Sequence, residues 1–263
     1  MNNAPTDPAS KATELLRLHQ SPPLLTVVNV YDVISAKVVA NTPGTKALAT
    51  ASHGIAATLG YEDGENIPVE EMLDMVGRIV KATDLPVTAD LEGGYGDAAD
   101  TIRRAIGVGA VGANIEDQLK PIDEASAQVE AMMRAAEAEG VPDFVLNART
   151  DAFILGGDRD PQEVVDDAIA RGRAFLEAGA QLVFVPGPLT EDMVKAMVDA
   201  FGEHKLTVIG SPGSPSLARL EELGVARVSY GPMPQRVALT ALQELVEEVG
   251  RGGGVPSTMR PLN

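Results

Sequence analysis

The sequence of 263 residues contains no cysteine, which excludes disulfide bonds, thiolate metal sites and a cysteine nucleophile. It has no tryptophan, and aromatic residues make up only 3% of the chain, which gives little support to platforms that stack nucleic-acid bases or sugars. The longest mostly apolar runs, such as 24–28 and 182–186, are far shorter than the roughly 20 residues that span a bilayer. The first residues show no basic segment followed by an apolar stretch, so we expect a soluble cytoplasmic protein with no membrane partner.

The chain carries a large excess of negative charge, with 38 acidic residues against 21 basic ones and a net charge of −17. This sign is wrong for binding a phosphate backbone, so we do not expect a nucleic-acid partner. One interpretation is that the surplus carboxylates lie on solvated helix surfaces and aid solubility. The other is that a few of them converge on a cation, and composition alone leaves both open.

Short β-branched runs alternate along the chain with longer segments of helical spacing. The predicted strands are 25–29, 46–50, 85–91, 112–116, 144–149, 181–185, 206–210 and 226–230. The predicted helices are 32–41, 69–83, 98–109, 125–140, 161–179, 190–201, 216–224 and 234–249. With 44% hydrophobic residues the chain can bury one large core, and no linker or shift in composition divides it.

Eight strand–helix units in a row predict a closed (β/α)8 barrel of the TIM type, an α/β fold that typically needs about 250 residues, rather than an open doubly wound sheet. We therefore predict a single domain over 1–263. Within it, residues 1–23 form an N-terminal extension, whose helical pattern over 10–19 would cap the bottom of the barrel or pack on a neighbour. The glycine-rich end, 251–263, is expected to be mobile.

Acidic residues stand at several predicted strand ends, which is where a (β/α)8 barrel places its active site. A spacing of two puts Asp90 and Glu92 on one face of the third strand, and Glu116 ends the fourth. The loop after the second strand adds Asp63. Four carboxylates this close need a compensating charge, and oxygen ligands favour Mg²⁺ or Mn²⁺ over zinc. The alternative is that Asp90 and Glu92 form ion pairs at the rim.

The fifth strand favours the metal interpretation, because Asn147 and Arg149 share one face near its end. Arg149 could hold a substrate carboxylate through two hydrogen bonds while a metal chelates the 2-oxo or 2-hydroxy oxygen. The alternative is an ion pair of Arg149 with Asp151 or Glu116. His53, in the loop after the second strand, could polarise a substrate oxygen or cap the loop, and the sequence does not decide between the two roles.

Two glycine-rich loops also follow predicted strands. The segment 93–96 is interpreted as a tight turn that lets the backbone pass close to the metal site. The segment 210–215 lies where many barrels bind phosphate, but its two prolines remove backbone donors and favour a rigid turn.

Together, the strand-end motifs resemble those of the isocitrate lyase and phosphoenolpyruvate mutase superfamily over most of the chain, from about Asn29 to Gly231. The motifs are Ala57-Thr-Leu-Gly-Tyr-Glu-Asp63-Gly-Glu, Asp90-Leu-Glu-Gly-Gly-Tyr-Gly96, Gly112-Ala-Asn-Ile-Glu116-Asp-Gln and Asn147-Ala-Arg149-Thr-Asp151-Ala. The resemblance implies a (β/α)8 barrel with Mg²⁺ at the strand ends. It also implies a homo-oligomer, a dimer or tetramer, whose eighth helix is commonly exchanged between subunits.

The resemblance assigns roles to individual residues. Asp90 would bind the metal directly, and Asp63, Glu92 and Glu116 would hold its water molecules. The catalytic set implied is Arg149, Glu116, Ser52 and Asp63. Arg149 would bind the substrate carboxylate, and the backbone around Ala51 and Ser52 would bind the oxyanion. The implied substrate-binding set is Tyr31, Ala51, Ser52, Asn147 and Arg149.

The departures from the family pattern bear on the reaction. Isocitrate and methylisocitrate lyases carry a Lys-Lys-Cys-Gly loop after the fourth strand, and this chain has no cysteine. Mutases and phosphonopyruvate hydrolases carry a gating loop with Lys, Asn and Ser at the same place, whereas here Glu116 leads almost directly into the next predicted helix. Lys120 could substitute for the family's loop lysine, although its offset from Glu116 differs. Ala51 stands where relatives have a serine.

Three functions are compatible with these residues. The first is a Mg²⁺-dependent lyase that cleaves a carbon–carbon bond in a small 2-oxo or 2-hydroxy carboxylate, such as oxaloacetate or a methylisocitrate-like acid. The second is mutase or hydrolase chemistry on a phosphorus–carbon bond, which needs a dry, closed site and is disfavoured by the short loop. The third is a barrel that binds a 2-oxo acid without turning it over. The motifs do not encode the substrate.

Overall fold

The computed structural model describes residues 7–262. The elements are α1 (Pro8–Gln20), β1 (Leu25–Val27), β2 (Asn29–Val30), α2 (Val33–Ala40), β3 (Leu48–Thr50), α3 (Ser52–Leu59), α4 (Val69–Lys81), β4 (Val87–Asp90), α5 (Ala98–Gly107), β5 (Gly112–Glu116), α6 (Ile122–Ala138), β6 (Val145–Arg149), α7 (Pro161–Glu177), β7 (Leu182–Val185), α8 (Glu191–Phe201), β8 (Leu206–Ile209), α9 (Leu217–Glu222), β9 (Arg227–Ser229) and α10 (Met233–Gly250). Residues 1–6 of the predicted extension and residue 263 of the predicted tail lie outside this range.

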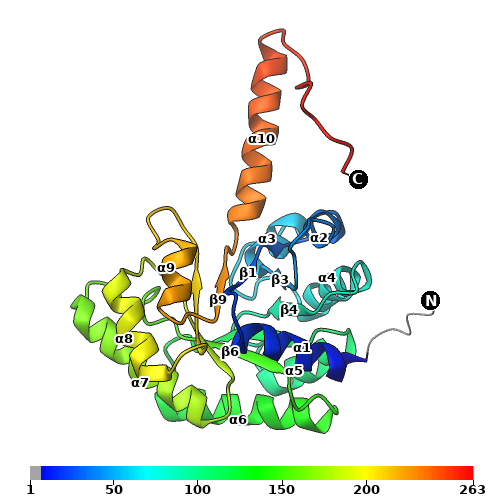
Figure 1. Ribbon diagram of the computed structural model, residues 1–263. Helices are drawn as coiled ribbons and strands as arrows, with labels where there is room; N and C mark the ends of the chain where they lie inside the picture. Colours follow the sequence, from blue (N-terminus) through cyan, green and yellow to red (C-terminus); the bar gives the residue numbers. More distant parts are fainter. Residues whose placement is uncertain (1–6, 263) are drawn as a thin grey trace.

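The strands form one parallel sheet in the order β1-β9-β8-β7-β6-β5-β4-β3-β2. Its two outer members are pieces of one strand, interrupted at Val28. β1 pairs with β9, and β2 pairs with β3, so the two edges of the sheet are joined by consecutive residues. The nine pieces therefore occupy eight barrel positions, and the predicted (β/α)8 fold is confirmed (Figure 1).

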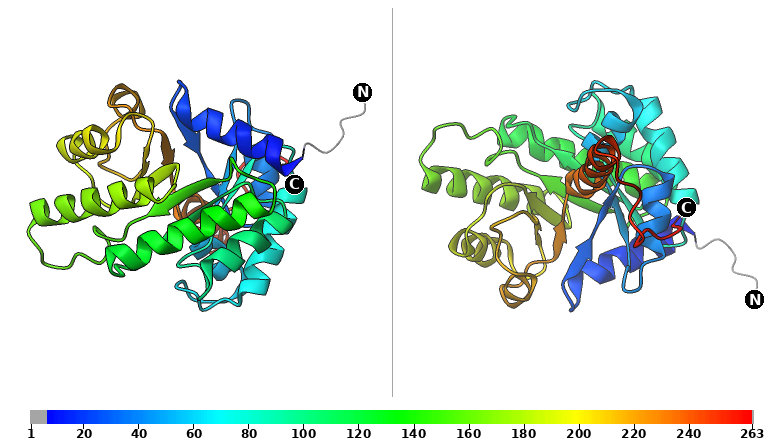
Figure 2. Two further views of the ribbon diagram at one scale, coloured as in Figure 1. Left: turned by 90° about the horizontal axis from the view of Figure 1, so that it is seen from below. Right: turned by 90° about the horizontal axis from the view of Figure 1, so that it is seen from above.

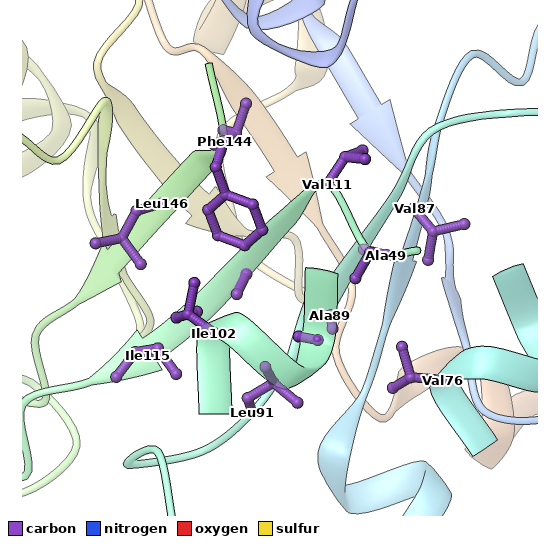
Figure 3. Packing of buried hydrophobic residues seen from close by; sticks show 14 of the residues in the cluster. Ala49, Val76, Val87, Ala89, Leu91, Ile102, Val111, Ile115, Phe144 and Leu146 are labelled. Atoms are coloured by element: carbon purple, nitrogen blue, oxygen red, sulfur yellow. The ribbon is translucent and has the colours of Figure 1, made fainter. Parts of the chain in front are cut away.

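The helices around the barrel follow from their sequences. In α4, for example, Met72, Val76 and Ile79 are fully buried on one face. Glu70 lies in the first turn of that helix and Arg78 in its last turn, which complements the helix dipole. The buried core runs between such helices and the sheet, and Figure 3 shows part of it around Phe144. Every predicted element is present, with ends within three residues of the predicted ones.

One helix was not predicted. Residues 52–59 form α3, where the sequence suggested a loop. Gly54 lowers helix propensity, but the fold requires it, because a Cβ atom there would lie 2.7 Å from Cβ of Tyr31. Gly60 ends the helix with a φ of 87°, the left-handed conformation that glycine adopts at helix ends. Packing against Tyr31 thus overrides the local propensity.

The extension places α1 across the bottom of the barrel, the end from which the strands begin (Figure 2, left). Leu15 and His19 of α1 are almost completely buried. Leu15 lies so close to Gly112, the first residue of β5, that a Cβ atom on that glycine would be 3.0 Å from the leucine Cδ2. Of the two predicted positions for this segment, capping the barrel bottom is the one observed.

The last helix leaves the barrel. After β9, α10 projects away from the other elements, and the chain then turns back beside it (Figure 1). Its apolar side chains Val237, Leu242 and Val246 are 56–70% exposed, and residues 253–258 and 260–262 are exposed too. Along the described chain, no helix is both long and apolar enough to cross a membrane.

Candidate active site

The predicted site residues end neighbouring strands at the upper rim of the barrel. Asp90 ends β4, Glu116 ends β5 and Arg149 ends β6. The register pairs Glu116 directly with Arg149, so their side chains leave adjacent strands at the same height. The alternation of strand side chains, used to predict this cluster, is therefore observed on β5 and β6.

The first turn of α3 holds the Asp90 carboxylate. Its Oδ2 accepts hydrogen bonds from the Ser52 backbone N–H at 3.0 Å and from Ser52 Oγ at 2.9 Å. The Asp90 N–H in turn donates to Thr50 Oγ1 at 2.9 Å. A helix N-terminus favours a nearby negative charge. Ala51, the residue before α3, is buried. Of the two residues expected to bind an oxyanion, the unpredicted helix supplies Ser52, whose N–H donates to Asp90, while the Ala51 N–H donates to the Val30 carbonyl at 3.1 Å.

Glu92 lies just beyond β4 and is almost fully buried. Its Oε1 accepts a hydrogen bond from Tyr95 OH at 3.0 Å, and its Oε2 accepts one from the Glu65 backbone N–H. Burial raises the pKa of Glu92 to about 7, against the lowering effect of these bonds, and the charges of Asp63 and Asp90 raise it further. Part of the Glu92 population is therefore neutral at pH 7.

Arg149 sits between two carboxylates. Its Nη1 lies 2.8 Å from Glu116 Oε2, and its Nε and Nη2 each lie 2.7 Å from Asp151 Oδ1. Burial raises the pKa of Glu116 to about 8, although Arg149 opposes the shift. The ion-pair alternative for Arg149 is thus present in the structure. A substrate carboxylate would bind there by taking over contacts that Glu116 now makes.

The remaining predicted residues differ in exposure. Asp63 is 49% exposed, and its Oδ2 lies 3.4 Å from Nδ1 of His53. Tyr31 is partly buried, and burial is the main cause that raises its pKa. Asn147 is fully buried, one step below the rim. Its amide donates to Asn114 Oδ1 at 2.7 Å and accepts from Thr207 Oγ1 at 2.8 Å, so it binds other protein side chains.

The four predicted carboxylates do not form a cage of direct metal ligands. Within residues 7–262, no group of three or more His, Asp or Glu side chains is arranged to hold a metal ion directly. The reason is that each carboxylate has its own protein partner: Ser52 for Asp90, Tyr95 for Glu92, Arg149 for Glu116 and His53 for Asp63.

The donor set nevertheless fits a largely hydrated magnesium ion. The negative charge of Asp90 raises the pKa of both Glu92 and Glu116. The three carboxylates therefore lie close enough to influence one another's charge. Mg²⁺ usually keeps several water molecules and takes only one or two protein carboxylates. One direct ligand with the other carboxylates bound to its waters satisfies both facts.

The loop after β5 is short and tied down by two residues that the sequence analysis missed. Asp117 is buried and accepts hydrogen bonds from the Leu119 and Asp151 backbone N–H groups, each at 3.0 Å. Arg171 of α7 donates to Asp117 Oδ2 at 3.0 Å and to the Lys120 carbonyl at 2.8 Å. Asp117 directly follows Glu116 and could have been noticed, but nothing local marks Arg171.

The same loop settles the position of Lys120. Its Nζ donates to Gln128 Oε1 of α6 at 3.3 Å, and Gln128 in turn donates to the Gly93 carbonyl at 3.2 Å. The lysine side chain thus belongs to the packing of α6 on the loop after β4.

Both glycine-rich loops are tight turns. Gly94 has a φ of 96°, and a Cβ atom there would lie 2.4 Å from Cβ of Ala98, so only glycine fits. In the loop after β8, the Ser211 N–H donates to Ser214 Oγ at 3.0 Å. The Ser214 N–H donates to the Ser211 carbonyl at 3.0 Å. These groups bind one another, which favours the rigid-turn interpretation over a phosphate site.

Comparisons with known proteins agree with this geometry. A family model described as phosphoenolpyruvate phosphomutase matches residues 15–250. The oxaloacetate decarboxylase of Paraburkholderia xenovorans (strain LB400) is 29% identical, over 93% of this chain and 84% of that protein. The 2-methylisocitrate lyase of Escherichia coli (strain K12) is 32% identical, over 78% of this chain and 72% of that protein.

A solved structure is similar over nearly its whole length. This protein of Burkholderia cenocepacia J2315, described provisionally as a phosphonomutase, has a TM-score of 0.85 and 41% identity, over 90% of this chain and 99% of that one.

Proposed function

Because the chain belongs to the phosphoenolpyruvate phosphomutase family, within the isocitrate lyase and phosphoenolpyruvate mutase superfamily, we propose that it is a Mg²⁺-dependent carbon–carbon lyase. Its proposed substrate is a small 2-oxo or 2-hydroxy dicarboxylate, such as oxaloacetate or a methylisocitrate-like acid. The observation that carries the proposal is the position of Arg149, a cation held beside Glu116 at the barrel mouth. The names of the decarboxylase and lyase relatives point the same way.

The residues proposed to hold the metal are those at the ends of the strands and in the loop after α3. Asp90 would be the direct ligand, and Glu92, Glu116 and Asp63 would bind its water molecules. When bound, the metal would polarise the oxygen next to the bond that breaks and favour the enolate that leaves. Mn²⁺ has the same preference for oxygen ligands and could replace it.

The chain's own groups would bind and orient the substrate. Arg149 would bind the carboxylate through its planar pair of N–H donors, with Glu116 giving up its contact. The backbone around Ala51 and Ser52, at the start of α3, would lie beside the developing oxyanion. Tyr31, which packs against Gly54 of that helix, would form one wall. Lys120, the other candidate proton donor, binds Gln128 of α6. Water would therefore protonate the product.

Phosphorus–carbon chemistry is the second candidate, favoured by the 41% identity to the structure described provisionally as a phosphonomutase. Such chemistry needs a site closed against water, and the loop after β5 contains only the five residues 117–121 between β5 and α6. Binding of a 2-oxo acid without turnover is the third, favoured by the ion pairs that already occupy Arg149.

We also propose that the protein is a homo-oligomer in which α10 packs on another subunit. The apolar side chains Val237, Leu242 and Val246 lie exposed on this helix. A groove of about 800 Å³ runs between α10 and the loop before α9, lined by residues such as Tyr230 and Leu220. Exposed apolar surfaces of this kind mark interaction sites. Size-exclusion chromatography with light scattering would test the proposal by measuring the mass of the protein in solution, and a monomer would contradict it.

The function is tested by incubating the protein with Mg²⁺ and a panel of oxaloacetate, methylisocitrate, substituted malates and phosphonopyruvate, followed by mass spectrometry of the products. We expect pyruvate or another 2-oxo acid, formed only with the metal. Asp90→Ala should lower turnover by roughly 10²- to 10³-fold, since it removes the direct ligand. The matched control is Asp74→Ala on the exposed face of α4, where the carboxylate pairs with Arg78.

Undiminished turnover in Asp90→Ala would refute the metal-dependent mechanism. Phosphate release from phosphonopyruvate would establish the second candidate. A wild-type protein that binds oxalate in the presence of Mg²⁺, yet converts none of the panel, would establish the third.

A further inference from the structure

A buried arginine crosses the interior of the barrel below the site. Arg227 is the first residue of β9, and its side chain is the largest of those that are fully buried. Its Nη2 donates to Asn114 Oδ1 at 3.2 Å. Asn114 lies on β5, which is separated from β9 by three strands in the sheet, so the contact spans the barrel interior.

Arg227 belongs to a layer of polar side chains directly under the site. Asn114 Oδ1 also accepts a hydrogen bond from Asn147, and Asn147 accepts one from Thr207. In the sheet, Asn114 pairs with both Asp90 and Asn147. The next inward-facing residues up β5 and β6 are Glu116 and Arg149, two residues further along each strand. The layer is therefore the floor on which the carboxylate cluster stands.

The guanidinium has no ion-pair partner among residues 7–262, whereas Arg149 and Arg171, which are also buried or partly buried, each contact carboxylates. Its Nε and Nη1 also lack hydrogen-bond partners within this range. An isolated buried charge is costly. The nearby base His19 of α1 offers no compensating negative charge, and its Nδ1 is hydrogen-bonded to the Leu15 carbonyl.

The group nevertheless stays charged. Burial lowers the pKa of Arg227 to about 10, and the negative charge of Asp90 opposes the shift. At neutral pH the guanidinium is thus protonated, and the carboxylate that acts on it is the proposed metal ligand.

We infer that Arg227 is the built-in counter-charge of the carboxylate cluster, acting from the barrel floor to balance affinity for a divalent cation against affinity for an anionic substrate. The inference rests on the proposed function. Arg227 touches none of the groups that would react and acts by its charge alone. Across a low-dielectric interior such a charge repels a metal ion and attracts a dicarboxylate.

This role predicts two changes of opposite sign. In Arg227→Met, which keeps much of the length and loses the charge, Mg²⁺ should bind roughly tenfold more tightly. Oxalate, a dianion that resembles the enolate product, should bind roughly tenfold more weakly at saturating Mg²⁺, because the guanidinium attracts an anion and repels a cation. In Arg227→Lys, which keeps the charge, both affinities should stay close to the wild type.

The experiment is isothermal titration calorimetry of full-length wild type and both variants, with Mg²⁺ and then with oxalate, and a melting temperature for each. Thr207→Val is the matched control, because it removes a hydrogen bond of the same layer without a change in charge. It should leave the ratio of the two affinities unchanged. If Arg227→Met does not fold, Arg227→Gln gives the same comparison.

Parallel weakening of both ligands in Arg227→Met would overturn the inference, since it would indicate a packing role. Unchanged affinities, or equal behaviour of the Lys and Met variants, would also overturn it. The calorimetry needs no turnover. A wild type that binds both ligands but converts no substrate would refute the lyase proposal and leave the counter-charge intact.

Discussion

The two ends of the barrel both bury titratable groups, but they treat them differently. At the mouth, burial pushes the pKa of Glu92 to about 7 and that of Glu116 to about 8, and each acid keeps a partner, Tyr95 or Arg149. At the bottom, which α1 covers, burial lowers the pKa of His19 to about 3. Acids at one end and a base at the other are thus driven toward neutrality.

The difference lies in access. Glu116 is partly exposed at the mouth, where a ligand can enter, so a bound cation can restore the negative charge of the cluster. His19, at the bottom, is 1% exposed and lies in α1 beside the fully buried Leu15. The carboxylates at the open end can therefore bind a cation. The buried base at the closed end affects only stability.

The largest effect is expected at the sealed end. The folded-state pKa of His19 is about 3, below the usual 6.5, so the unfolded chain binds the extra proton first. Its contribution to stability is complete above pH 6.5 and is lost as the pH falls toward 3. We expect a loss of a few kcal/mol between pH 7 and pH 4, measured by urea unfolding.

His19→Leu should remove most of this acid sensitivity. The control is His204→Asn, because His204 is partly exposed and its φ of 61° suits asparagine. If His19→Leu loses stability in acid as steeply as the wild type, the sealed end is not the cause.

The mouth should show the opposite dependence. The folded-state pKa of Glu116 is raised to about 8 from 4.5, so its contribution to stability is present below pH 4.5 and is lost as the pH rises through 8. For the metal-free protein we expect a decrease of about 2 kcal/mol between pH 5 and pH 8, discounted because the side chain is 17% exposed.

Glu116→Gln should flatten this slope in unfolding experiments run with a chelator. Glu130→Gln on the exposed face of α6, where the carboxylate binds only Arg134, should leave it unchanged. A slope that persists in Glu116→Gln would assign the pH dependence to another group.

The smallest effect concerns the connection between the mouth and the surrounding helices. Arg171→Met would release Asp117 and with it the Asp151 backbone that Asp117 holds. Since Asp151 orients Arg149, we expect KM for the dicarboxylate to rise about tenfold with a smaller change in kcat. Hydrogen exchange of the Leu119 and Lys120 amides should also become faster.

The control for this variant is Arg173→Met, two residues further along α7, whose guanidinium reaches only the Ala200 carbonyl at 3.4 Å. Faster exchange of the loop without any change in KM would mean that the loop is held by Arg171 but does not position Arg149.

Much of this comparison could be predicted from the sequence, because it depends on local periodicity. Counting strand–helix units gave the barrel, and the spacing of two brought Glu116 and Arg149 to the same rim. Glu92 was placed near Asp90 by the same rule, yet β4 ends at Asp90 and Glu92 has a φ of 54°. A turn, not strand alternation, directs its side chain.

The parts that the sequence did not predict depend on contacts between distant residues. Arg171 binds Asp117 across 54 positions, and Arg227 binds Asn114 across 113, and no local pattern encodes either pair. The hydrogen bond between Ser52 and Asp90 was unpredicted for the same reason, because 38 positions separate the two residues. In addition, Ser52 begins a helix where the sequence suggested a loop.

The interruption of the first strand at Val28 has a consequence for how the chain folds during synthesis. β1 finds its neighbour only in β9, where Leu25 pairs with Arg227, so one edge of the first strand stays unpaired until nearly the whole polypeptide has left the ribosome. Contacts between segments so far apart form slowly, and open strand edges promote aggregation in the meantime. During synthesis the N-terminal strand therefore stays exposed to aggregation for the longest time. A chain that ends before residue 227 would lack the strand that closes the barrel.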